Sequence, residues 1–169
     1  MSQNSETAAQ IDESQGSEET LPLSKYFTSS EWLAYAAVVL AGVLLRWLEL
    51  DARPYHHDES QHAMFGKYFF DWPELQFYKY DPMMHAPLLY NLLRPVYTAL
   101  GHTLWSARVP IALLGTAFLF VPLIFRRHFS PTALLALTAG LVLSPNLVYW
   151  SRFLIHDYLV IASLVITLY

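Results

Sequence analysis

The fold of this chain is decided by a largely apolar stretch, WLAYAAVVLAGVLLRWLEL, which occupies residues 32–50. Its nineteen residues rise about 28 Å in an α-helix, close to the roughly 30 Å thickness of the hydrocarbon layer of a bilayer. Arg46 interrupts the stretch one turn from its end. We interpret Arg46 mainly as a side chain that snorkels to the membrane interface, and alternatively as one that faces the helix bundle and binds an anion. The stretch therefore predicts a membrane-spanning helix.

The composition of the whole chain also indicates that it lies in a lipid bilayer. Of the 169 residues, 54% are hydrophobic and 14% are charged, whereas a soluble domain carries about 25% charged residues. Aromatic residues reach 15%, and membrane interfaces favour Trp and Tyr. The chain has no cysteine, which excludes disulfides and thiolate chemistry. The net charge of −4 argues against nucleic acid as a partner.

Three further apolar stretches predict spans at 109–125, 132–150 and 158–169. The expected fold class is therefore all-α, a polytopic transmembrane helix bundle of about four spans that starts near residue 31. The last stretch is still apolar at Tyr169, so we expect a truncated membrane domain that further helices would complete. Residues 1–24 are acidic and almost devoid of large apolar side chains, which predicts a disordered tail.

The segment 51–105 is too rich in charge to lie in lipid and predicts a loop outside the bilayer. Within this loop we expect short juxtamembrane helices at 58–70 and 87–100. Arg126 and Arg127 are the densest basic cluster next to a span, so the positive-inside rule places them in the cytoplasm. The acidic tail is then cytoplasmic and the loop external, in a multi-pass protein of the cell (plasma) membrane.

The clearest chemical signal is a run of histidines and carboxylates from His56 to His62. Asp58 is expected to cap the short helix, with Gln61 three residues further on. On that helix Asp58 and Glu59 lie within one turn of His62. The set can bind a divalent metal, or it can supply a general base whose pKa the second carboxylate tunes. The alternative is structural, with a cap, a partner for the helix dipole and polar loop residues. We favour the functional interpretation.

Two more polar clusters flank predicted spans. The segment from Tyr80 to Tyr90 is either a turn at the membrane surface or part of a site. Arg152 suits an anionic phosphate, because a guanidinium pairs with phosphate oxygens in a bidentate way. Asp157 is equally an acid of the site or the N-cap of the next helix. If the segment 87–100 does not cross the membrane, as we expect, both loops lie in one compartment and Asp58 and Asp157 should converge on a single site. If it crosses, the two residues lie on opposite sides.

In their order and spacing these motifs resemble the N-terminal module of the GT-C membrane glycosyltransferases. The resemblance rests on Asp58-Glu59, His85-Ala-Pro-Leu-Leu-Tyr90, Ala-Arg-Val-Pro at 107–110, Arg-Arg-His-Phe at 126–129, and Ser-Pro-Asn-Leu-Val-Tyr-Trp-Ser-Arg at 144–152 with Asp157 five residues later. The chain looks similar to the dolichyl-phosphate-mannose–protein mannosyltransferases and the bacterial aminoarabinose transferases. The His-His pair before Asp-Glu looks most like the prokaryotic flippase activity-associated membrane proteins. The chain has Ala86 where the mannosyltransferases usually have a second proline.

The resemblance implies inverting transfer of a hexose, in the manner of a mannosyltransferase, from a polyprenyl-phosphate donor to a protein, lipid or glycan on the outer face. It implies catalytic roles for Asp58, Glu59 and Asp157. The candidate substrate-binding residues are Arg53, His57, His62, His85, Tyr90 and Arg152. A divalent metal (Mg, Mn or Zn) would be held by Asp58, Asp157 and His62. The alternative function is a lipid-linked sugar flippase, or a subunit associated with one, without bond chemistry.

Overall fold

The computed structural model of the chain describes residues 22–72, 74 and 87–168. Over these residues the fold is all-α and contains no strand. Most of the predicted tail over 1–24 lies outside the described residues, as does the segment 75–86 that contains His85.

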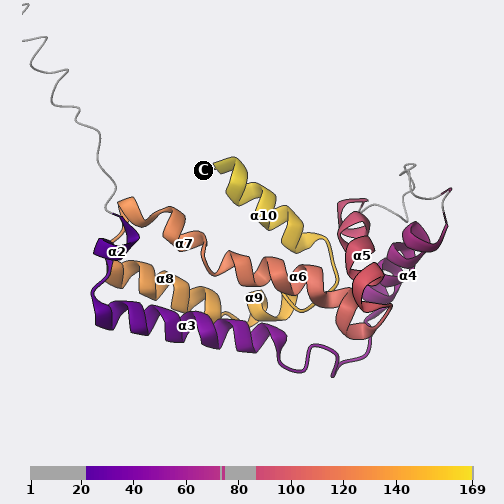
Figure 1. The fold of residues 1–169 in the computed structure, drawn as a ribbon, viewed down its shortest axis with the longest axis horizontal. Coiled ribbons are helices and arrows are strands. Elements are labelled where there is room, and N and C mark those ends of the chain that lie inside the picture. The colour runs from indigo at the N-terminus through magenta and orange to yellow at the C-terminus, as the bar shows by residue number, and fades with distance from the viewer. Residues whose placement is uncertain (1–21, 73, 75–86, 169) are drawn as a thin grey trace, which may run out of the picture.

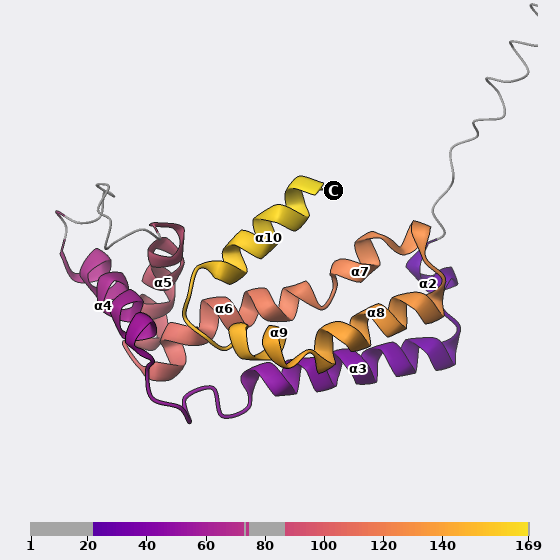
Figure 2. The ribbon, with the colours of Figure 1, turned by 180° about the vertical axis from the view of Figure 1, so that it is seen from behind.

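A bundle of helices forms the long axis of the molecule (Figures 1 and 2). α3 (Ser29–Trp47) packs along α8 (Pro131–Leu143) and also contacts α6 (Leu104–Phe118). After a break α6 is followed by α7 (Val121–Ile124). The chain therefore runs up and down the same axis several times, as the apolar stretches predict.

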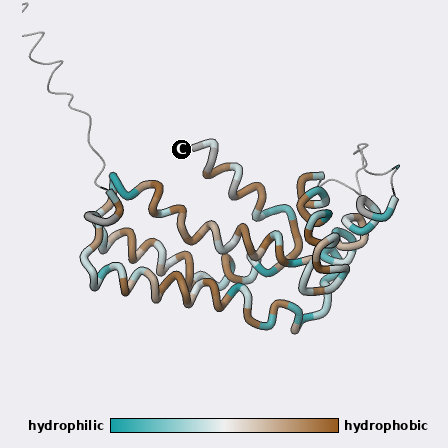
Figure 3. The backbone as a smooth tube through the Cα atoms, viewed as in Figure 1, coloured by the Kyte–Doolittle hydropathy of each residue, from teal (hydrophilic) through white to brown (hydrophobic). Residues whose placement is uncertain are grey.

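The two ends of the bundle differ in composition. One end carries the paired helices α4 (His57–Asp71) and α5 (Pro87–Leu100). The short helix α9 (Pro145–Trp150) is followed by a loop, and α10 (Asp157–Leu168) starts from that loop and packs on α6. We call the end with α4, α5 and this loop the polar end, because hydrophilic residues gather there (Figure 3).

The opposite end carries α2 (Leu23–Tyr26) beside the 3-10 turn η2 (Arg126–His128) (Figure 1). The Tyr26 hydroxyl donates a hydrogen bond to the Phe129 carbonyl, which ties the two segments together. The basic pair of η2 therefore lies at the end of the bundle away from α4.

In the part of the chain that the structure describes, two helical segments are long and apolar enough to cross a membrane, Ser29–Trp47 and Leu104–Ile124. The first matches the predicted span over 32–50 apart from its ends. The second begins earlier than the predicted 109–125, because Thr103 caps it and pairs with Ser106 in a capping box.

The prediction of one helix over 132–150 is wrong, because the helix is interrupted at Ser144. Ser144 is extended, with ψ of 112°, and it ends α8 and begins α9 at once. The reason is Pro145, because the residue before a proline is sterically pushed out of the helical region. Neither α8 nor α9 is long enough by itself to cross a bilayer of ordinary thickness.

The cap predicted for α4 is also wrong. The N-cap is His56, whose ring accepts from the Asp58 N–H, while the His56 N–H donates to the Glu59 carboxylate at 3.1 Å. Asp58 therefore lies inside the first turn, where its charge still favours the helix dipole. α5 has the bounds expected for the juxtamembrane helix, Pro87–Leu100.

The snorkelling orientation favoured for Arg46 is not the one observed, because its side chain is fully buried. It donates to the Gly42 carbonyl at 3.0 Å and to the Leu141 carbonyl of α8 at 3.2 Å. The Leu141 carbonyl lies in the last turn of α8 and has no donor within that helix, because the residue four positions later is Pro145, which lacks an N–H. Arg46 therefore faces the bundle interior.

Small residues permit close approach between α6 and the segment after α9. A Cβ built on Gly115 of α6 would lie 2.4 Å from the Ser151 Cβ. Ser151 is fully buried, and its Cβ is fixed to the backbone, so it cannot move aside as the end of a long side chain would. In contrast, a Cβ on Gly140 of α8 would meet no atom within 4 Å.

We expect Gly115→Ala to destabilise the fold by about 1–3 kcal/mol, because overpacking at a rigid contact forces the backbone apart. The matched control is Gly140→Ala, which should be neutral or stabilising by up to about 1 kcal/mol, since alanine is the better helix former. Thermal unfolding in detergent, followed by circular dichroism, measures both. Equal midpoints for the two variants would contradict the close packing described for Gly115.

Candidate functional site

The centre of the polar end is the carboxylate of Glu59, which is fully buried. Its Oε1 accepts from Arg108 Nε at 2.9 Å and from the Leu154 N–H at 2.9 Å. Its Oε2 accepts from Arg108 Nη2 at 3.0 Å and the His56 N–H at 3.1 Å, and it pairs with Arg53 Nη2 at 3.1 Å. One side chain thereby joins α4, α6, the loop before α4 and the loop before α10.

Arg108 completes this arrangement from the first turns of α6. Besides its two bonds to Glu59, it donates to the carbonyls of Leu50 at 2.8 Å, Arg53 at 2.9 Å and Pro54 at 3.2 Å. All five N–H groups that a guanidinium possesses are thus used. In the sequence, Arg108 is singled out only as part of the Ala-Arg-Val-Pro motif at 107–110. A lone charge at the start of an apolar span was the signal that could have identified it.

Burial alone would raise the pKa of the Glu59 carboxyl. Hydrogen bonds from Arg108 and from the main-chain N–H groups of Leu154 and His56, together with the charge of Arg108, outweigh burial and hold this pKa below its ordinary value. Glu59 is therefore ionised and saturated with hydrogen bonds. This geometry favours a positioning role for Glu59 over the catalytic role expected from the sequence.

The lowered pKa of Glu59 predicts a pH-dependent stability. Above the ordinary glutamate pKa of about 4.3 the ion pair contributes fully, and its contribution is lost as the pH falls through the lower pKa of the folded state. We expect the thermal unfolding midpoint in detergent to fall as the pH is lowered from about 7 to about 3.

The comparison variant for this prediction is Glu59→Gln. It should be less stable at neutral pH, by about 3–5 kcal/mol, because it leaves Arg108 buried without its counter-ion. Its midpoint should also depend less on pH than that of the wild type. Asp71→Asn, at the far end of α4, should follow the wild-type profile. A Glu59→Gln profile parallel to the wild type would refute the assignment.

Arg53 differs from Arg108 in being half-open to solvent. Its ion pair within the described residues is with Glu59, and 38% of its side chain is exposed. Its guanidinium lies over the rings of Tyr149 at 5.4 Å and Phe153 at 4.9 Å, which are favourable cation–π distances. Glu59 therefore carries two arginines, and the cluster of Arg53, Glu59 and Arg108 has an excess of one positive charge.

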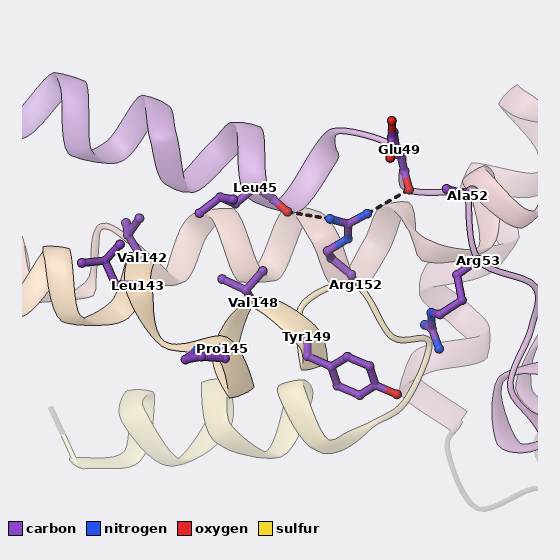
Figure 4. A pocket seen from close by; sticks show the side chains of 10 residues that line it. All are labelled: Leu45, Glu49, Ala52, Arg53, Val142, Leu143, Pro145, Val148, Tyr149 and Arg152. Carbon is purple, nitrogen blue, oxygen red and sulfur yellow. Dashed lines mark hydrogen bonds between the residues drawn. The ribbon is translucent and has the colours of Figure 1, made fainter.

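A cleft of about 590 Å³ opens beside Arg53. Its walls come from the end of α3, the loop after it, the end of α8, and α9 with the residues that follow. The lining residues are Leu45, Glu49, Ala52, Arg53, Val142, Leu143, Pro145, Val148, Tyr149 and Arg152 (Figure 4). The apolar members lie together at one side and the arginines at the other (Figure 4). We call this the donor cleft, after the N–H donors of Arg53 and Arg152 in its wall.

Arg152, expected to bind phosphate, does line the donor cleft, but it is also occupied structurally. It donates to the carbonyls of Leu45 at 2.9 Å, Leu48 at 2.8 Å and Glu49 at 2.8 Å. The Leu45 carbonyl lies in the last turn of α3 and the Leu48 carbonyl at its C-cap, while the Glu49 carbonyl, just beyond the helix, also accepts from the Ala52 N–H. Burial, and the charges of Arg108 and Arg53, lower the pKa of Arg152, while Glu49 opposes the shift.

Asp58 precedes the buried Glu59 in the first turn of α4, but its side chain faces solvent, with 51% of it accessible. Its oxygens lie 3.6 Å from His56 Nδ1 and 3.4 Å from His57 Nδ1. The His56 ring lies 5.4 Å from the Phe153 ring, against which Arg53 also packs. Asp58 is thus connected to the cleft residue Arg53 only through His56 and Phe153, and its carboxylate is accessible to solvent.

The remaining predicted residues gather where α4 meets α5 and α10. His62 Nδ1 lies 3.1 Å from the Tyr90 hydroxyl, and its ring lies 5.7 Å from that of His156. Asp157 is exposed in the first turn of α10, with Oδ1 3.7 Å from His156 Nε2. Asp58 and Asp157 therefore both lie at the polar end of the bundle, each in the first turn of its helix.

The set expected to hold a metal is not assembled as such. Among the described residues no group of three or more histidine, aspartate and glutamate side chains is placed to hold an ion. His62 is buried while Asp58 and Asp157 are exposed. His85 lies outside the described residues.

No known protein family, curated protein or solved structure matches this chain.

Proposed function

We propose that this chain belongs to an integral membrane glycosyltransferase that takes a sugar from a polyprenyl-phosphate donor. The observation that carries the proposal is the donor cleft, which is apolar along α3 and α8 and cationic where the loops begin. A lipid phosphate has the same division, with a hydrocarbon chain joined to an anionic head group. The motifs that resemble GT-C enzymes supply the expectation of a sugar.

A bilayer explains the outer surface of the bundle. α3 is apolar, yet only 17% of its most apolar 18-residue stretch is buried inside the molecule. Leu33, Leu40 and Leu44 are exposed along one side of it, and hydrophobic residues dominate the long helices (Figure 3). A soluble protein rarely exposes so continuous an apolar face. We place this surface in lipid, with the polar end at the external interface.

The charge at the cleft suits a head group with one negative charge. Arg53 shares Glu59 with Arg108, which leaves one positive charge unbalanced. Arg152 adds a second cation to the cleft wall and Glu49 an anion. The balance of these groups is again one positive charge, which matches a sugar phosphodiester. Partial exclusion of water by the apolar wall strengthens such a pairing.

In the proposed reaction, the Asp58 carboxylate takes the proton of an acceptor hydroxyl. The hydroxyl oxygen attacks the anomeric carbon of the donor sugar and forms the new glycosidic bond. The bond between that carbon and the phosphate oxygen breaks, and the lipid phosphate leaves with the electron pair. Arg53 stabilises the charge of the departing phosphate, and attack from the opposite side inverts the anomeric centre.

We expect Asp58→Asn to fold normally and to lose transfer by a factor of at least about 100, because general-base catalysis contributes about that much or more. The measurement is loss of labelled mannose from polyprenyl-phosphate mannose in membrane vesicles that contain the protein. The control is Asp71→Asn, which removes an exposed carboxylate at the other end of α4. Transfer at the wild-type rate in Asp58→Asn would end the catalytic assignment.

The donor cleft also favours a second candidate, a lipid-linked sugar flippase or an associated subunit, because binding a head group does not require chemistry. In this case Asp58→Asn would still move labelled lipid-linked sugar across proteoliposomes, and no glycosidic bond would form with the wild type. A transferase forms the bond and requires Asp58. The same vesicles therefore separate the two functions.

The proposed reaction has no step on a metal, because Asp58, Asp157 and His62 do not form one cluster of ligands among the described residues. A divalent ion remains a prediction for this site. Transfer that persists after strong chelation would exclude it, and transfer that returns on adding Mg²⁺, Mn²⁺ or Zn²⁺ would support it.

A further inference from the structure

The hydrogen bonds of the donor cleft can be counted donor by donor. Arg152 has both Nη2 hydrogens on the carbonyls of Leu48 and Glu49, and one Nη1 hydrogen on Leu45. Releasing the bond to Leu45 or to Leu48 would leave that carbonyl without another partner among the described residues, whereas the Glu49 carbonyl also accepts from the Ala52 N–H. Arg152 is therefore committed to closing the end of α3, and it offers a ligand its charge more than its hydrogen bonds.

Arg53 and Tyr149 have donors to spare. Among the described residues Arg53 makes an ion pair with Glu59 through Nη2 and donates no hydrogen bond, so most of its guanidinium is available to the cleft. The Tyr149 hydroxyl makes no hydrogen bond to any residue that the structure describes, and 46% of the residue is exposed. Both side chains line the cleft (Figure 4). These two are the donors that a bound anion can reach without breaking an existing bond.

The ring of Tyr149 is held in place on several sides. Phe153 lies at 5.5 Å and Trp150 at 5.1 Å between ring centroids, and Arg53 lies over the ring at 5.4 Å. A tyrosine in such a cluster presents its hydroxyl with little loss of side-chain entropy on binding, since the ring is already ordered. It also donates a hydrogen bond without adding charge.

We infer that Arg53 and Tyr149 together bind the phosphate of the lipid donor, and that Tyr149 is a ligand-binding residue which the motifs did not identify. This inference rests on the proposed function, because it concerns the donor of that reaction. Arg53 contributes the charge and directional N–H groups, and Tyr149 contributes a neutral donor to a second phosphate oxygen. Arg152 forms the wall and keeps α3 in position.

The test uses phytanyl phosphate, an isoprenoid monophosphate, titrated into the detergent-solubilised protein by calorimetry. Tyr149→Phe should weaken its binding by about tenfold or more, because a hydrogen bond to a charged group is lost. Arg53→Gln should weaken it at least as much. Arg152→Gln should act mainly on stability and lower the thermal unfolding midpoint. Tyr68→Phe, a half-buried tyrosine on α4 away from the cleft, is the matched control and should bind like the wild type.

The outcomes separate the two claims. Unchanged affinity in Tyr149→Phe with loss in Arg53→Gln overturns the role of Tyr149 and leaves the donor cleft in place. Unchanged affinity in both variants overturns the cleft as the donor site. The neutral alcohol phytanol is the second probe, and it should bind Tyr149→Phe and the wild type equally. If Tyr149→Phe weakened the binding of phytanol as much as that of phytanyl phosphate, Tyr149 would contribute only to the shape of the apolar wall. That result would overturn the inference.

Discussion

The arrangement of the polar end depends on a single buried ion pair, between Glu59 of α4 and Arg108 of α6. A buried carboxylate and a buried guanidinium are tolerated only when the geometry is good and the remaining donors and acceptors are satisfied. Here both conditions hold, because every N–H of Arg108 and both oxygens of Glu59 are engaged. The pair fixes where the loops before α4 and α10 lie, and so fixes Asp58 and the donor cleft.

Arginines bound to main-chain carbonyls recur through this fold. Arg46 and Arg152 both donate to carbonyls near helix C-termini, and Arg108 donates to three loop carbonyls. A helix end or loop beside an apolar bundle cannot rely on water for its carbonyls, so it needs side-chain donors. The rigid, branched guanidinium can reach several carbonyls at once. The same residues give this end its positive charge, so structure and binding draw on one set of side chains.

The helices could be predicted well because they depend on local sequence. Apolar runs of sufficient length specify α3 and α6, and Pro145 marks the break after α8 once its effect on Ser144 is considered. The site was harder, because its contacts join distant positions. The burial of Glu59 follows from Arg108, 49 residues away, and no periodicity links the two. Likewise the sequence shows that Arg152 is charged, but it does not show that Arg152 already donates hydrogen bonds to three main-chain carbonyls.

Arg152 also imposes an order on synthesis. The carbonyls at the end of α3 receive their donor from a residue more than 100 positions later in the chain. At about 5–20 residues per second on the ribosome, the first helix waits roughly 5–20 s for that donor. During this interval the carbonyls at the end of α3 need another donor, such as water. If α3 spans a bilayer as proposed, its last turn has to stay at the interface until residue 152 has been synthesised.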